Sequence, residues 1–205
     1  MFTGLIREVA KVESFRGDIL TIKANYKPKI GDSVAINGVC LTVIDVTNST
    51  FALEVAKETK SIIPKEKFLN RVHIEPAMQM SDRFEGHIVQ GHVDTVGEVV
   101  QIKPSSDGVD FFIKVEPKYI KYIVPKGSIA IDGVSLTINE VFNDSFRLTI
   151  ISHTFNETLF KEYKVGSKVN IETDFFARYI EHILLNQKQK DVPTWQDIDA
   201  INMSY

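Results

Sequence analysis

SVAINGVCLTV at residues 33–43 and SIAIDGVSLTI at residues 128–138 are two copies of one eleven-residue pattern. Seven of the eleven positions are identical, and the remaining four pair Val with Ile twice, Asn with Asp, and Cys with Ser. Chance does not produce such agreement in an ordinary chain. The two stretches begin 95 residues apart, which predicts a tandem repeat of about that length and therefore two homologous domains.

Each copy alternates apolar and small residues at period two, breaks at Asn-Gly or Asp-Gly, and then resumes with Leu-Thr-Val or Leu-Thr-Ile. This pattern predicts two β-strands that meet at a turn or bulge, where Gly supplies backbone freedom. The two copies differ most in chemistry directly after the turn, where Cys40 stands in one and Ser135 in the other.

The repeat extends well beyond these segments. Residues 1–12 match residues 88–99 at an offset of 87, so that Gly4 corresponds to Gly91, whereas the offset at Cys40 and Ser135 is 95. Eight extra residues therefore lie between these points in the second copy, and we expect them in a hairpin around residues 103–108. The match continues to about residue 173 and predicts domains at 1–87 and 88–173, followed by a region at 174–205.

Turn residues divide the first copy into short alternating segments. Strands are expected in residues 2–14, 19–24, the two halves of 33–43, 51–56 and 71–75, and a short helix in residues 57–69. Six short strands in one small domain favour a closed or nearly closed barrel, because closure leaves few exposed strand edges. The fold class is therefore all-β, with two tandem six-stranded barrels.

The region after residue 173 has no counterpart in the first copy. Asp174 is a candidate helix cap, and apolar residues then recur at three- and four-residue spacing, namely Phe176, Tyr179, Ile180, Ile183 and Leu184. This amphipathic helix at 174–185 lies beyond two complete barrels, so we expect its apolar face to pack on another subunit. From Asn186 the chain is polar and is expected to end as a loose tail that contains Trp195.

Composition narrows the class of protein. The chain has 205 residues, a net charge of −3 and 43% hydrophobic residues, which suffices for a core but gives no basic face for nucleic acid. A single cysteine excludes an internal disulfide and fits a reducing cytosol. The N-terminus does not resemble a signal peptide, and no apolar run reaches the roughly 18 residues that span a membrane. We therefore expect a soluble, cytoplasmic protein.

Taken singly, the reactive residue types favour structural interpretations. A lone cysteine such as Cys40 is most often a small buried apolar residue, and the five scattered histidines predict no metal site. No nucleotide-binding loop is present in the sequence. Matched features nevertheless recur in both copies: a Gly near the start, Leu-Thr after Cys40 or Ser135, and polar residues at 57–59 and 152–154. These matches predict two similar ligand pockets.

Four stretches are similar to a known family. MFTG at residues 1–4, NGVCLTV at 37–43, GHIVQGHV at 86–93 and DGVSLTI at 132–138 closely resemble the riboflavin synthase family of the α-chain type. The resemblance runs from residue 1 to about 185. It implies two Greek-key barrels, a homotrimer held by a C-terminal helix, and a reaction without a cofactor or metal ion. In that reaction, two molecules of 6,7-dimethyl-8-ribityllumazine exchange a four-carbon unit to give riboflavin and 5-amino-6-ribitylamino-uracil.

The resemblance also implies which residues contact the two lumazines, which in this family lie between barrels of neighbouring subunits. One pocket would be lined by Gly4, Leu5 and Ile6, by Cys40, Leu41 and Thr42, and by Glu54, Val55, Ala56, Lys57, Glu58 and Thr59. The other would be lined by Gly91, His92 and Val93, by Lys126, by Ser135, Leu136 and Thr137, and by Ile151, Ser152, His153, Thr154, Phe155 and Asn156.

Catalytic roles follow from the same resemblance. Cys40, or a water that it positions, would attack C7 of one lumazine. The acidic C7 methyl group of the other lumazine would lose its proton to a relay of His92, Ser135 and Thr137. Asp132 and Lys126 would support these groups, and the role of His153 stays open.

Two other functions share this architecture. Non-enzymatic lumazine- or flavin-binding fluorescent proteins resemble the same family, but such relatives tend to lose polar residues in one barrel, whereas both barrels keep them here. Flavin-dependent reductases also use such a barrel, but this chain lacks a partner nicotinamide domain. The enzyme is therefore favoured over both.

Overall fold

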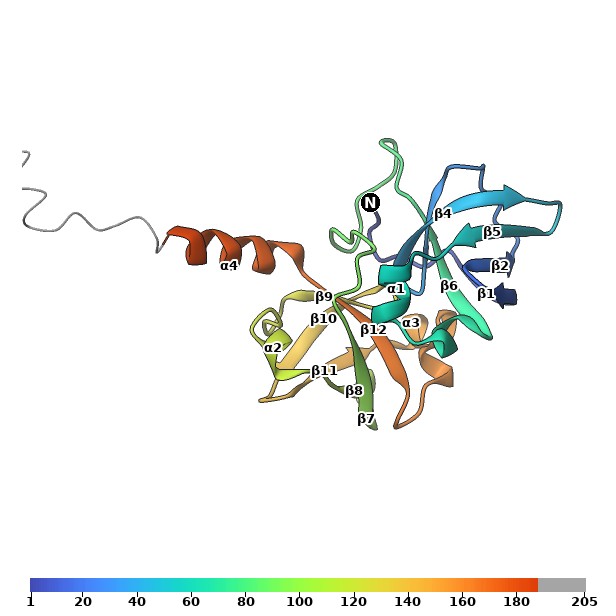
Figure 1. Ribbon diagram of the computed structural model, residues 1–205. Helices are drawn as coiled ribbons and strands as arrows, with labels where there is room; N and C mark the ends of the chain where they lie inside the picture. The colour runs from blue at the N-terminus through green and yellow to red at the C-terminus, as the bar shows by residue number, and fades with distance from the viewer. Residues whose placement is uncertain (188–205) are drawn as a thin grey trace, which may run out of the picture. The chain divides into compact units, whose positions relative to one another are not determined.

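The repeated segments form β-hairpins in the computed structural model, which describes residues 1–187 (Figure 1). Asn37 and Gly38 have φ of 46° and 79°, and Asp132 and Gly133 have φ of 46° and 82°. Positive φ at both central residues is the signature of the type I′ turn, whose twist matches that of the flanking strands. The predicted turn is confirmed in both copies.

Each repeat closes into a six-stranded antiparallel barrel, as predicted. The first has the strand order β1-β2-β5-β4-β3-β6 and the second β10-β11-β8-β7-β12-β9. The first barrel contains β1 (Glu8–Arg16), β2 (Ile19–Lys23), β3 (Ser33–Ile36), β4 (Val39–Val46), β5 (Thr50–Glu54) and β6 (Arg71–Pro76), with α1 (Lys57–Ile62) and the 3₁₀ helix η1 (Lys65–Phe68) between β5 and β6. Because β2 pairs with β5 rather than β3, the order is that of a Greek key.

The second barrel repeats this plan and adds one helix. It contains β7 (Thr95–Ser105), β8 (Gly108–Lys114), α2 (Pro117–Ile120), β9 (Ser128–Ile131), β10 (Val134–Val141), β11 (Ser145–Ile150), α3 (Ser152–Glu157), the 3₁₀ helix η2 (Leu159–Glu162) and β12 (Lys168–Thr173). Strand β1 begins later than expected, because residues 2–7 form a lead-in segment before the barrel.

The eight extra residues of the second copy are divided between two places. Val12 pairs with Ile22, and Val99 pairs with Ile113, so the offset between copies has grown from 87 to 91 at the second strand. Four extra residues therefore lengthen the β7–β8 hairpin, and the other four lie between β8 and β9, where α2 stands. The expectation that all eight lie in the hairpin is wrong, because a short helix accommodates the remainder.

Apolar side chains of alternating strand positions fill each barrel. Leu20, Ile22 and Leu53 have no solvent exposure in the first barrel, and Phe111 and Ile113 have none in the second. Each such side chain stabilises the fold by about 1.5–3 kcal/mol relative to an exposed one. Period-two alternation turns the intervening residues outward, which is where the polar residues of the repeated segment stand.

The C-terminal region forms a separate unit from residue 175. Helix α4 (Phe175–Gln187) confirms the helix predicted at residues 174–185. The apolar stripe predicted from its spacing is exposed, with Ile180 and Leu184 at 56% and 55%. Trp195 and most of the predicted tail lie outside the described residues. Within residues 1–187, no helix has the length and apolar character needed to cross a membrane.

Candidate functional site

The lead-in segment before each barrel packs against the other barrel. The backbone N–H of Ser135 donates to the carbonyl of Gly4 over 2.8 Å, and the N–H of Cys40 donates to the carbonyl of Gly91 over 2.9 Å. Ile6 packs against the core of the second barrel, and Val93 packs against the core of the first. The two lead-in segments are therefore exchanged between the barrels.

Two buried carboxylates hold these segments in place. Glu75, on β6, accepts hydrogen bonds from the backbone N–H groups of Thr3 (2.7 Å) and Gly4 (3.1 Å). Glu172, on β12, accepts from Gln90 (2.7 Å) and Gly91 (2.9 Å) in the same way. Burial raises the pKa of Glu75 although these N–H donors act in the opposite direction. The last strand of each barrel thus directs its own lead-in segment toward the opposite barrel.

Cys40 lies in a cavity of about 370 Å³. Its lining combines residues of the first barrel with the exchanged segment of the second: Val39, Cys40, Glu58, Thr59, Ile62, Ile63, Gly91, His92 and Val93. The thiol is free and half-buried, and His92 is anchored by its backbone N–H, which donates to Glu172 over 3.1 Å. A volume near 400 Å³ is at the small end of pockets that hold metabolites, so this cavity suits a single bicyclic ligand.

Ser135 occupies the equivalent position on the second barrel and contacts a histidine that the sequence did not single out. The Nδ1 atom of His87 lies 2.7 Å from the Ser135 Oγ atom. Burial lowers the pKa of His87, and the negative charge of Asp174 partly opposes that shift. The imidazole is therefore neutral near pH 7, which leaves one of its ring nitrogens free to accept a proton.

Both reactive residues stand on the outer face of their barrels. Cys40 and Thr42 are adjacent outward positions of β4, and Ser135 and Thr137 are the corresponding positions of β10. Leu41, between the first pair, is buried in the core. The hydroxyl and thiol groups can thus reach a ligand that lies against the outside of the barrel.

Of the remaining predicted residues, Glu58 and Thr59 line the cavity of Cys40. Most of the stretches Glu54–Thr59 and Ile151–Asn156 are exposed in and before α1 and α3, although Val55 is fully buried. Lys126 is exposed, has φ of 67°, and donates its backbone N–H to the carbonyl of Ile138. Among the described residues, no group of His, Cys, Asp and Glu side chains could hold a metal ion.

Asp132 is not among the residues that line the cavity of Cys40. It is fully buried, its Oδ2 accepts from Lys67 Nζ (2.7 Å) and the Tyr163 hydroxyl (2.5 Å), and its Oδ1 accepts from the Asn170 N–H (2.9 Å). All of its carboxylate contacts are made inside the junction between the barrels. Burial among three donors gives this carboxylate a structural role, and its expected support of catalysis stays a prediction.

His73 completes this junction. Its Nδ1 atom lies 2.9 Å from the Asp132 carbonyl, which can only accept, and its Nε2 accepts from the Leu159 N–H over 2.8 Å. These two backbone partners fix the neutral ring with its proton on Nδ1. Full burial lowers the pKa of His73 to about 4.

Two groupings implied by the resemblance differ from the contacts in the structure. The resemblance places Gly4–Ile6 in the pocket of Cys40 and Gly91–Val93 in that of Ser135. The structure pairs them in the opposite way. In particular, His92 lines the cavity of Cys40, whereas His87 is the histidine at Ser135. The only signal for His87 in the sequence was the repeated Gly-His at residues 86–87 and 91–92.

Comparison with known proteins agrees with this architecture. The model of the lumazine binding domain family matches the chain twice, over residues 3–77 and 90–174. The riboflavin synthase of Photobacterium phosphoreum is 42% identical over 98% of this chain and 97% of its own length. The riboflavin synthases of Bacillus subtilis (strain 168) and Schizosaccharomyces pombe are 40% and 38% identical over 100% and 90% of this chain, and over 98% and 94% of their own.

Solved structures share the fold at lower sequence identity. LumP complexed with riboflavin has a TM-score of 0.75 and 21% identity, covering 85% of this chain and 100% of its own. LumP complexed with 6,7-dimethyl-8-(1′-D-ribityl) lumazine has a TM-score of 0.72 and 22% identity, covering 85% and 99%. At these identities the likeness concerns the fold of the two barrels.

Proposed function

The chain belongs to the riboflavin synthase family, and on that premise we propose that Cys40 and Ser135 mark two half-sites, each of which binds one 6,7-dimethyl-8-ribityllumazine. The reaction transfers a four-carbon unit from one lumazine to the other, giving riboflavin and 5-amino-6-ribitylamino-uracil. The proposal rests on the matched placement of Cys40 and Ser135, whose backbone N–H groups each donate to a glycine of an exchanged segment. Because the two positions have similar surroundings, they are suited to two molecules of the same substrate.

The size of the Cys40 cavity supports one lumazine in each half-site. About 370 Å³ is enough for one bicyclic ring with part of its ribityl chain, and we propose that the second molecule is held in the other half-site. We propose that the half-site of Cys40 in one subunit faces the half-site of Ser135 in a neighbour. Bringing two bound rings together converts a bimolecular encounter into a nearly unimolecular step.

The structure supports distinct roles for the two half-sites. In the first, Cys40 or a water that it positions adds to C7 of one lumazine, and His92 lies beside it in the same cavity. In the second, the neutral His87 accepts the Ser135 hydroxyl proton as Ser135 takes a proton from the acidic C7 methyl group of the other lumazine. Thr137, outward on the same strand, and Lys126 are proposed to position that substrate.

The exposed apolar stripe of α4 supports a homotrimer. Isolated large apolar side chains are common on surfaces, but an entire helix face in contact with water favours association. The free thiol of Cys40 fits a reducing compartment, and we infer that the protein acts in the cytoplasm.

The test is turnover of purified dimethylribityllumazine by the full chain, followed by the absorbance of riboflavin. Cys40→Ala and Ser135→Ala are each expected to slow turnover at least about a hundredfold while lumazine binding stays measurable. Arg16→Gln, an exposed substitution at the far end of β1, is the control and should retain full activity. A wild-type chain that binds lumazine without forming riboflavin would instead be a binding protein.

A further inference from the structure

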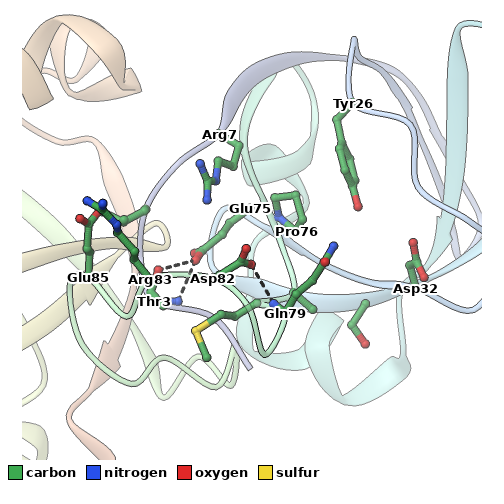
Figure 2. Close-up of a pocket in the computed structure, with 14 residues that line it drawn as sticks. Thr3, Arg7, Tyr26, Asp32, Glu75, Pro76, Gln79, Asp82, Arg83 and Glu85 are labelled. Carbon is green, nitrogen blue, oxygen red and sulfur yellow. Dashed lines mark hydrogen bonds between the residues drawn. The ribbon is translucent and has the colours of Figure 1, made fainter.

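A second cavity, larger than that of Cys40, lies between the first barrel and the linker that joins the barrels (Figure 2). Its volume is about 710 Å³. Four segments wall it: the lead-in residues Thr3 to Arg7, the β2–β3 loop around Tyr26 and Asp32, the end of β6, and linker residues up to Glu85. Neither Cys40 nor Ser135 lines it, so the half-sites do not explain this cavity.

Most of the acidic groups in this cavity are already used by the protein. The Glu75 carboxylate accepts from Thr3 and Gly4, Asp32 accepts from the N–H of Lys29 over 2.8 Å, and Asp82 accepts from the N–H of Gln79 over 2.8 Å. These bonds fix the walls of the cavity, since each closes a loop or holds a segment. The carboxylates therefore shape the site and have less capacity to bind a cation.

The two arginines are not used in this way. Neither Arg7 nor Arg83 has a side-chain hydrogen bond or ion pair with any residue in the described part of the chain. Figure 2 shows the guanidinium of Arg7 pointing toward the middle of the cavity. Four carboxylates and two guanidinium groups line the site, and three of the carboxylates (Asp32, Glu75 and Asp82) keep their charge but are turned to backbone N–H donors. Within the described residues, the charged groups left to meet a ligand are the two guanidinium groups and the carboxylate of Glu85.

Tyr26 supplies a flat apolar surface across the cavity from Arg7 (Figure 2). The ring is half-buried and is held by edge contact with Phe51, at 6.4 Å between centroids and 88° between planes. Burial and the nearby Asp32 raise the pKa of Tyr26, so its hydroxyl is protonated and able to donate. An aromatic ring across the cavity from the guanidinium of Arg7 is suited to a ligand with both a flat ring and an anionic group, and Figure 2 places Arg83 farther from Tyr26, near Glu85.

We propose that this cavity, defined by Arg7, Arg83 and Tyr26, binds a phosphate ester of a heteroaromatic molecule of nucleotide size. Guanidinium groups match phosphate oxygens in paired, charge-assisted hydrogen bonds. The volume is too large for inorganic phosphate alone and lies within the range for complete small-molecule ligands. The ligand would also adjoin the segment whose Gly4 carbonyl contacts Ser135, so its binding has a direct route to one half-site.

The experiment compares phosphorylated and unphosphorylated probes on the full chain by isothermal titration calorimetry. ADP is paired with adenosine, and flavin mononucleotide with riboflavin, so that the two arms distinguish a purine from a flavin ligand. Riboflavin is kept at saturation during the ADP and adenosine titrations to fill the half-sites. At least one phosphorylated probe is expected to bind one site per chain at least about tenfold more tightly than its unphosphorylated partner.

Arg7→Gln with Arg83→Gln should remove that tenfold preference while leaving riboflavin binding unchanged. Arg16→Gln, which removes an exposed arginine outside the cavity, should keep it, and circular dichroism should show both variants folded. Equal binding of all four probes, or a phosphate preference that survives in the double variant, would overturn the proposal. Turnover of lumazine by the wild type is measured separately. A negative result in the titrations would therefore overturn the phosphate-ester site without bearing on the proposed function of the half-sites.

Discussion

A Cβ atom placed on Gly91 would lie 2.6 Å from the Cβ of Cys40, closer than side chains ever approach. The matching distance from Gly4 to the Cβ of Ser135 is 2.5 Å. Each half-site is thus built around a backbone contact that only glycine permits. The exchanged segments belong to the sites themselves, because they form one wall of each.

Gly91→Ala is expected to disrupt the half-site of Cys40. Gly91 has φ of 82°, so alanine adds backbone strain of about 1–3 kcal/mol to the collision with Cys40. The segment should withdraw, lowering both the free energy of unfolding in urea and the turnover rate. Gly166→Ala is the control, since φ there is 91° but nothing lies within 4 Å of the added Cβ. If both variants lose the same turnover, the close contact is not what matters.

The buried pair of Lys67 and Asp132 should show strong energetic coupling. Removing one partner leaves an uncompensated buried charge, so Lys67→Met and Asp132→Asn should each lower the free energy of unfolding by about 3–5 kcal/mol. The double variant should be more stable than the sum of these losses predicts, because removing both partners leaves no unpaired buried charge. Additive losses in urea unfolding would contradict this coupling.

An exposed ion pair provides the comparison for that cycle. Lys114 and Asp144 are 2.9 Å apart, but their side chains are 58% and 45% exposed. Solvent screens such pairs, so the same double-mutant cycle at Lys114 and Asp144 should show much weaker coupling than at Lys67 and Asp132.

His73 should make the fold less stable in mild acid. Its pKa is about 4 in the folded chain and near 6.5 when unfolded, so the unfolded chain binds the proton more readily. The contribution of the neutral His73 ring to the free energy of unfolding is present above pH 6.5 and is lost as the pH falls toward 4. At pH 5 the loss amounts to roughly 2 kcal/mol. His73→Asn, which copies Asn170 at the equivalent position, should show a smaller drop between pH 7.5 and pH 5 in urea unfolding. An unchanged drop would assign the acid sensitivity to other groups.

His87 and Ser135 should act as a unit in turnover. His87→Gln removes the base, so kcat should fall by about 10²–10⁴ with little change in KM, and adding Ser135→Ala should cost little more. Because the pKa of His87 is lowered in the folded chain, the ring should stay neutral to a lower pH than an ordinary histidine. The fall of kcat on acidification should therefore begin at a lower pH. Independent, multiplicative effects on kcat would show that the two residues do not share one proton path.

The apolar stripe of α4 should control assembly. Ile180 and Leu184 are one helical turn apart, so replacing both with Glu places two charges on one face of the helix. Light scattering is expected to show a smaller particle than the wild type, with the circular dichroism of the barrels retained. Arg178→Glu with Glu181→Arg alters charge on the same helix without touching these two residues. A wild-type mass in the Ile180/Leu184 variant would refute a role for this stripe.

The duplicated barrel could be predicted from the order of residues alone. The repeated eleven residues predict the hairpin, since Asn-Gly and Asp-Gly fit positive φ and period-two alternation separates core from surface. Cys40 and Ser135 stand out as the aligned pair that differs most in chemistry, and the spacing of apolar residues predicts the helix after residue 173. All of these features depend on local backbone geometry, which neighbouring residues encode.

Which distant parts of the chain meet became known from the three-dimensional fold. The resemblance implied that Gly4 shares a pocket with Cys40, whereas Glu75 and Glu172 turn each lead-in segment across to the other barrel. The same crossing separates His92 from Ser135 and brings in His87. The contacts of Glu75 and Glu172 join residues that are more than seventy positions apart in the sequence. They depend on buried hydrogen bonds between distant segments, which a local pattern of residues does not predict. A repeat shows that two halves are alike, but packing decides how they are joined.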